Sequence, residues 1–104
     1  MGGGDTVEVT GQVWLWKAGG EGGQAWHFVT VDGQEEANLR YAALGRTAGF
    51  GSIRVSVIVG TSRWQTSLFP LRESGGMVLP LKAEVRKREG IKVGDRITLR
   101  LEVS

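Results

Sequence analysis

Regular alternation of apolar and polar residues marks much of this chain as β-strand. The clearest case is residues 96–103, where every odd-numbered position from Ile97 to Val103 is apolar, as in a strand with one face on a core. Gly11 inside the first such stretch predicts a bulge or a bend. The pattern as a whole predicts six strands, over residues 6–16, 25–31, 52–59, 63–69, 77–79 and 96–103.

Two short helices are predicted between these strands, over residues 33–44 and 81–89. Asp32 is a suitable N-terminal cap for the first helix, Pro80 a suitable start for the second, and Gly90 a suitable left-handed cap at its end. The apolar side of the first helix, which we expect to face the core, is formed by Ala37, Tyr41 and Leu44.

The order of these elements predicts a mainly β fold. Short links between strands favour antiparallel pairing, and closure would remove the exposed edges of an open sheet. We therefore expect a small six-stranded, mostly antiparallel (split) β-barrel with two short helices. Residues 6–104 should form a single domain, because 104 residues are too few for two stable cores. Residues 1–5, which include three glycines, should be a disordered leader.

The composition excludes several kinds of chemistry. The chain has no cysteine and a single histidine, His27, which excludes disulfides, thiolate chemistry and a cysteine- or histidine-rich zinc site. No nucleophile-elbow motif flanks any serine. Together with the lack of cysteine and of a second histidine, this leads us to expect no catalytic, metal or cofactor site and no enzymatic activity. No apolar run approaches the roughly 20 residues needed to span a bilayer. Without a secretory signal, a cytoplasmic location without membrane insertion is expected.

Charge is unevenly distributed along the chain. Residues 1–45 have two Lys or Arg against six Asp or Glu, a net charge of −4, whereas residues 46–104 have eleven against five, a net charge of +6. Such asymmetry attracts an anionic partner if folding gathers the cations into a patch. Solvated strand and helix faces explain the same charges without any partner.

The four tryptophans suggest a ligand site. They can pack in the core or line an aromatic cavity with cations nearby, and the sequence leaves both interpretations open. Arg54 should point away from the core, because the apolar residues of its strand occupy the other face. Trp64 is structural if it shares the core face of the hairpin, and it forms a pocket wall with Arg54 if it shares the opposite face. We favour a pocket at the barrel mouth, into which Lys82 can reach. The site is predicted to bind a small anionic or planar ligand through stacking and charge-assisted bonds, and to be bordered by Trp26, Phe28, Arg54, Trp64, Lys82 and Arg86.

The alternative is a nucleic-acid-binding barrel. Phosphate binding should weaken steeply with added salt, whereas a stacked ligand should respond little. Residues 86–88 should not bind duplex DNA tightly, since successive helical positions diverge by about 100°. We expect a monomer or weak homodimer. The cations available to this alternative are Lys82, Arg86, Lys87, Arg88, Lys92 and Arg96.

Three blocks carry a family resemblance: AWHFVTV, GFGSIRVSVIVGTSRWQTSLFP and GGMVLPLKAEVRKREGIKVGD. With them, residues 7–103 resemble the bacterial domain of unknown function nineteen-oh-five, a small split β-barrel sometimes fused to a YdeI/OmpD-associated domain. The resemblance implies a fold but no reaction or ligand. The end of the last block also resembles the hairpin of AbrB-type swapped-hairpin regulators, which bind DNA as dimers. Cap and turn chemistry explains the same residues without DNA.

Overall fold

The computed structural model describes residues 6–17, 25–46, 51–71 and 75–104. The predicted leader, residues 1–5, lies outside the described residues, as do residues 18–24. The elements in chain order are β1 (Thr6–Lys17), β2 (Ala25–Val31), α1 (Gly33–Ala42), β3 (Ile53–Val59), β4 (Ser62–Pro70), β5 (Met77–Pro80), α2 (Ala83–Glu89) and β6 (Arg96–Val103).

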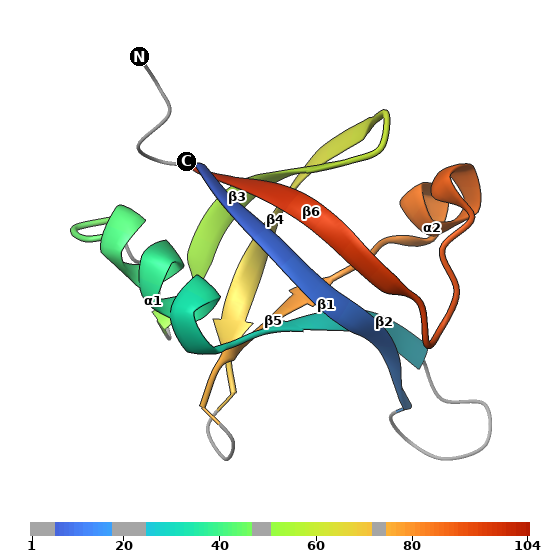
Figure 1. Cartoon of the computed structure of the whole chain (residues 1–104), viewed down its shortest axis with the longest axis horizontal. Coiled ribbons are helices and arrows are strands. Elements are labelled where there is room, and N and C mark those ends of the chain that lie inside the picture. Colours follow the sequence, from blue (N-terminus) through green and yellow to red (C-terminus); the bar gives the residue numbers. More distant parts are fainter. Residues whose placement is uncertain (1–5, 18–24, 47–50, 72–74) are drawn as a thin grey trace.

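The six strands form a closed barrel in the order β1-β2-β5-β4-β3-β6, and β6 returns to β1. Every pairing is antiparallel. The predicted fold class, a mainly β barrel of six strands with two short helices, is therefore confirmed. Figure 1 shows α1 and α2 at opposite ends of the barrel.

Strand β1 has two partners along its length. Residues 6–12 pair with β6, and residues 13–17 pair with β2. Gly11 lies just before the change and pairs with Ile97 in unbroken register, so the expected bulge is not seen. A Cβ atom at Gly11 would lie 2.8 Å from Cγ1 of Val29 and 3.1 Å from the carbonyl oxygen of Thr30. The glycine therefore permits a close approach between β1 and β2.

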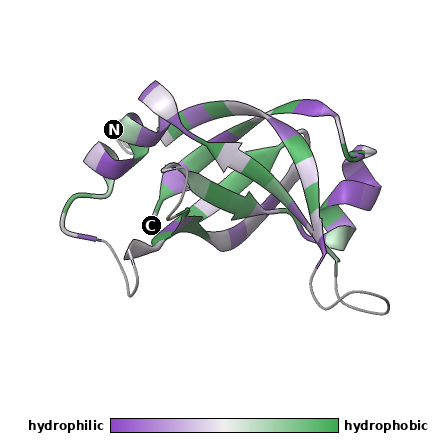
Figure 2. Ribbon diagram, turned by 90° about the horizontal axis from the view of Figure 1, so that it is seen from below, coloured by the Kyte–Doolittle hydropathy of each residue, from purple (hydrophilic) through white to green (hydrophobic). Residues whose placement is uncertain are grey.

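The core fills the barrel with inward-facing side chains from all six strands. Bands of high and low hydropathy alternate along the strands in Figure 2, whereas α2 is mostly hydrophilic. Both helices add to the core from the barrel ends, α1 through Leu39 and α2 through Val85. Trp64 belongs to this core, with 8% of its surface exposed.

The buried side of α1 differs from the prediction. Leu39 and Ala43 pack in the core, whereas Tyr41 and Leu44 are 78% and 71% exposed. The predicted stripe through Ala37 is therefore on the solvent side of the helix. Both stripes have helical spacing, so packing against the barrel decides which of them is buried.

A hydrogen bond to β1 explains the orientation of α1. The Glu35 carboxylate accepts a hydrogen bond from the backbone N–H of Thr10 at 3.1 Å. Leu39 follows Glu35 by four residues and so lies on the same side of the helix. Asp32 occupies the N-cap position, but its side chain forms no cap hydrogen bond. Contact with the barrel, rather than capping by Asp32, thus sets how α1 is seated.

The start of α2 also differs from the prediction, while its end agrees. Pro80 is the last residue of β5, and the Leu81 backbone N–H extends the pairing by donating to the carbonyl of His27 at 2.9 Å. The helix begins at Ala83 instead. Gly90 ends it with a φ of 67°, as the left-handed cap predicted.

Candidate functional site

A groove on the outer surface of the barrel is formed by exposed apolar side chains. It has a volume of about 420 Å³. Its three largest exposed side chains, Trp16, Trp26 and Phe69, are 49%, 46% and 48% exposed, far more than is usual for aromatic residues of this size. We call this surface the aromatic groove. It is lined by Trp16, Trp26, Phe28, Phe69, Val78 and Pro80.

Strand register brings these residues to one face. Directly opposed residues of antiparallel strands project to the same side of a sheet. Trp16 lies opposite Trp26 in the β1–β2 ladder, and Phe28 lies opposite Pro80 in the β2–β5 ladder. Phe69 joins them from β4, where it lies opposite Val78 of β5. The groove therefore crosses four neighbouring strands of the barrel.

Trp14 supports the groove next to Phe28. The centroids of the two rings are 5.1 Å apart, with 45° between their planes, a favourable tilted arrangement. The indole N–H of Trp14 donates to the hydroxyl of Thr30 at 2.8 Å. Trp14 is thus held in place by both a ring contact and a hydrogen bond, and it fixes the position of Phe28 in the groove.

A second cavity, of about 310 Å³, adjoins the aromatic groove at Trp26. Its polar side chains are His27 and Arg86. The guanidinium of Arg86 donates through Nε to the carbonyl of Leu81 at 3.4 Å, and its Nη1 lies 3.3 Å from Nε2 of His27. We call this cavity the arginine pocket. It is lined by Ala25, Trp26, His27, Leu81, Ala83 and Arg86.

The contact with Arg86 assigns the proton of neutral His27. A guanidinium can only donate, so Nε2 of His27 must accept and the proton must sit on Nδ1. Nδ1 is buried and has no hydrogen-bond partner in the described part of the chain. Burial lowers the pKa of His27 below its usual 6.5, and the positive charge of Arg86 lowers it further.

The contact between Arg86 and His27 should be visible in the titration of the imidazole. In an NMR pH titration, His27 should have a pKa below 6.5, and Arg86→Gln should raise it by removing the adjacent charge. Because the folded-state pKa is depressed, the His27 contribution to stability is complete above 6.5 and decreases as the pH falls toward the folded value. A pKa unchanged by Arg86→Gln would contradict the contact between the two side chains.

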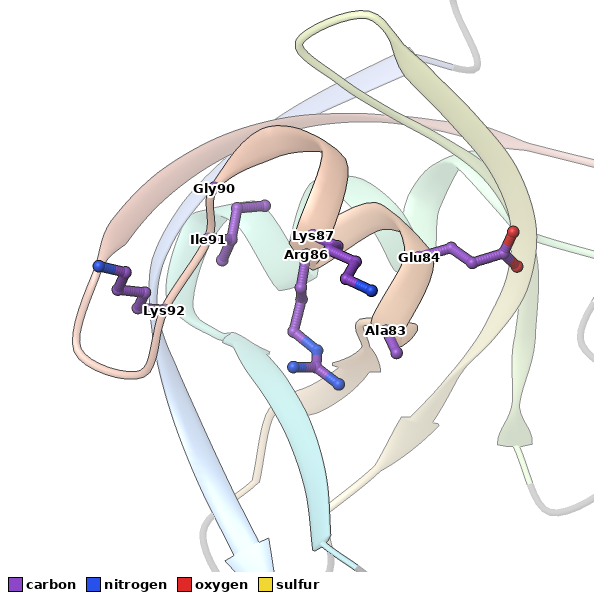
Figure 3. Close-up of a pocket in the computed structure, with 7 residues that line it drawn as sticks. All are labelled: Ala83, Glu84, Arg86, Lys87, Gly90, Ile91 and Lys92. Carbon is purple, nitrogen blue, oxygen red and sulfur yellow. The ribbon is translucent and has the colours of Figure 1, made fainter.

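A third cavity, of about 520 Å³, lies along α2 and shares Ala83 and Arg86 with the arginine pocket. Figure 3 shows Arg86 and Lys87 extending to the same side of the helix, with the Glu84 carboxylate pointing away from them. Within the described residues, Arg86, Lys87 and Lys92 have no carboxylate in ion-pair contact. We call this cavity the basic pocket. It is lined by Ala83, Glu84, Arg86, Lys87, Gly90, Ile91 and Lys92.

The C-terminal end of α2 is fixed to the barrel by Glu89. Its carboxylate accepts hydrogen bonds from the hydroxyls of Ser62 at 2.6 Å and Thr61 at 3.3 Å. The Ser62 hydrogen bond is the main reason that the pKa of Glu89 is lowered. Ile91, just after the helix, is buried in the core. These contacts determine where α2 presents Arg86 and Lys87.

The structure brings together three of the six predicted site residues. Trp26 and Phe28 line the aromatic groove, and Trp26 and Arg86 line the arginine pocket. Trp64 instead packs in the core, opposite Val57. Its ring is therefore unavailable to a ligand on the outer face.

The other two predicted site residues lie apart from these cavities. Arg54 is exposed on the outer face opposite Ser67, as the alternation of its strand predicts, and lines none of the three cavities. Lys82 is exposed at the N-cap position of α2 and also lines none of them.

The predicted site residues do not include four that line the aromatic groove: Trp16, Phe69, Val78 and Pro80. Trp16 is out of phase with the core residues Val9 and Val13 of its strand, and Phe69 directly follows the core residue Leu68. This alternation indicates that both aromatic residues face outward. Pro80 gives no such signal, because it follows the predicted strand 77–79 and reads as the start of the helix after it. Among the described residues, no three His, Cys, Asp or Glu side chains gather as a metal site would require. None of the described helices has the length and apolar character of a membrane span.

The fold and these cavities define a class: a small closed β-barrel with an apolar outer groove that runs into a basic region on a flanking helix. The chain belongs to the family described as "Domain of unknown function (DUF1905)", which it matches over residues 10–101. The family resemblance found in the sequence is therefore confirmed. None of the curated proteins compared with the chain matches it.

Proposed function

We propose that this protein is a non-enzymatic binding module for a small ligand with a flat apolar part and an anionic group. The observation that carries the proposal is the position of Trp26, which lines both the aromatic groove and the arginine pocket. A ring stacked in the groove would thus place its substituent beside Arg86. An aromatic surface with a few placed polar groups is typical of small-molecule sites.

The chemistry of Arg86 suits an anion. A guanidinium has five N–H donors in a planar fork, and the contacts with Leu81 and His27 involve only Nε and Nη1. Donors therefore remain for a carboxylate, sulfonate or phosphate. The apolar lining of the adjoining groove lowers the local dielectric, which strengthens such a charge-assisted bond.

The proposal is tested with the fluorescent probe anilinonaphthalene sulfonate, which has fused rings and one anionic group. Trp26→Ala should weaken its binding about tenfold. The stacking of a flat ring on an aromatic side chain, as measured for nucleic-acid bases, contributes about 1–3 kcal/mol. Arg86→Gln should weaken probe binding to a similar extent, because hydrogen bonds to charged groups contribute about 1.5–3 kcal/mol. Tyr41→Ala is the matched control, since Tyr41 is an exposed aromatic residue on α1, at the other end of the barrel.

A neutral probe separates the two contributions. Phenylnaphthylamine has the same fused rings without the sulfonate, so Trp26→Ala should weaken its binding while Arg86→Gln should not. Near-ultraviolet circular dichroism of each variant verifies that the fold is retained. Equal binding of the sulfonate probe to the wild type and to Trp26→Ala would refute the proposed site.

The nucleic-acid alternative is not favoured by the arrangement of the basic run on α2. Arg86 contacts His27 of β2, whereas Arg88 donates to the hydroxyl of Ser62 in β4 at 3.4 Å. β5 lies between those two strands, so the two arginines are directed to separate parts of the barrel. Tight, salt-sensitive binding of duplex DNA, lost when residues 86–88 are reversed in charge, would instead support the alternative.

A further inference from the structure

We infer that the ligand of this site is a nucleotide or a related phosphorylated heterocycle, with its ring in the aromatic groove and its phosphates in the arginine and basic pockets. This inference rests on the proposed function and adds the chemical class of the ligand. It also assigns a role to the basic pocket, which a ligand with one flat part and one anionic group would leave unused.

The three cavities adjoin one another in a fixed order. Trp26 is common to the aromatic groove and the arginine pocket, and Arg86 is common to the arginine pocket and the basic pocket. Arg86 therefore stands between an apolar surface and further cations. A ligand that fills all three cavities must be apolar and flat at one end and anionic at the other.

The charges along α2 indicate more than one negative charge on the ligand. Lys87 and Lys92 line the basic pocket with Arg86, and within the described chain none of the three has a carboxylate in ion-pair contact. Among the described residues that line this pocket, Glu84 is the only acid, and its carboxylate points away from Arg86 and Lys87 (Figure 3). Phosphoryl groups supply several oxygens and more than one negative charge, which both arginine and lysine bind well.

The aromatic groove also determines which ring is bound. The described residues that line it are apolar, and the only side-chain hydrogen-bonding groups among them are the indole N–H groups of the tryptophans. The groove therefore offers few hydrogen bonds to the edge of a base, and affinity should increase with the area of the stacked ring. Purines should bind better than pyrimidines, with little difference between adenine and guanine.

The experiment measures displacement of anilinonaphthalene sulfonate from the intact protein. ADP should displace it at a concentration about tenfold lower than adenosine or pyrophosphate, because only ADP engages both the groove and the cations. GDP should resemble ADP, and CDP should be weaker. Single-stranded oligodeoxyadenylate is the other source of the same base and phosphate chemistry. If this oligonucleotide displaces the probe at lower concentrations than ADP does, the site binds a base and its phosphates as inferred. The ligand is then a single strand of nucleic acid and not a free nucleotide.

Matched variants test the basic pocket. The double variant Lys87→Gln/Lys92→Gln should weaken ADP binding about tenfold. It should leave binding of the probe unchanged, because the probe has only one sulfonate. Arg100→Gln, which removes an exposed cation on β6, should change neither. These substitutions lie on the surface, so the variants should fold normally.

The outcomes separate this inference from the proposed function. If the probe binds in a manner that depends on Trp26 and Arg86 but ADP does not displace it, the nucleotide inference is wrong and the proposed function stands. If probe binding does not depend on Trp26, the proposed function is wrong. If ADP displaces the probe equally well from the wild type and from the double lysine variant, the basic pocket does not hold its phosphates.

Discussion

Replacing Trp64 with alanine is expected to lower the free energy of unfolding by about 3–5 kcal/mol. The side chain is 8% exposed and packs in the barrel core opposite Val57. Its removal would leave a large cavity that the surrounding β-sheet cannot collapse to fill. Urea denaturation monitored by far-ultraviolet circular dichroism measures the loss as a lower midpoint at unchanged slope.

Two controls show that the effect is one of packing. Lys82→Ala, at the exposed N-cap position of α2, should leave the melting temperature nearly unchanged. Trp64→Ala, measured below its unfolding transition, should still bind the sulfonate probe, because Trp64 lies outside the aromatic groove. A loss of stability below about 1 kcal/mol would mean that the tryptophan is not a core residue.

The second large effect is expected at Gly11. Valine at this position should destabilise the protein by about 1–3 kcal/mol, the usual cost of overpacking. The added Cβ alone would lie 2.8 Å from the Val29 side chain and 3.1 Å from the Thr30 carbonyl. The same denaturation experiment measures the change.

Glu8→Val is the matched control for this substitution. It places the same side chain at an exposed position of the same strand, where the change should stay within about 0.5 kcal/mol. If Gly11→Val were as stable as Glu8→Val, β1 and β2 would not approach each other closely at this point.

The strands could be predicted from the sequence because each buries one face. The bounds of β2 and β6 agree with the alternation. Those of β1, β3 and β5 differ by one residue at one end, and those of β4 by one residue at both ends. The helix faces could not be predicted in the same way. In α1, Leu39 and Tyr41 belong to different apolar stripes, and only the contact with β1 selects between them.

The candidate site depends on strand order more than on residue type. The outward direction of Arg54 follows from its own strand, but the inward direction of Trp64 follows from its register with β3. The aromatic groove requires that β5 lie between β2 and β4, although it follows both in the chain. Periodicity describes one strand at a time, so it cannot show that Trp26 and Phe69 share a surface.

The divided pairing of β1 has a consequence for synthesis of the protein on the ribosome. Residues 6–12 form their ladder with β6, which is translated after the other described strands of the barrel. Until it emerges, this half of β1 has unpaired backbone groups and the apolar side chains of Val7 and Val9 lack part of their packing. Contacts between segments so distant in the chain form slowly. The nascent chain therefore presents an open sheet edge, the kind of surface that chaperones protect from aggregation.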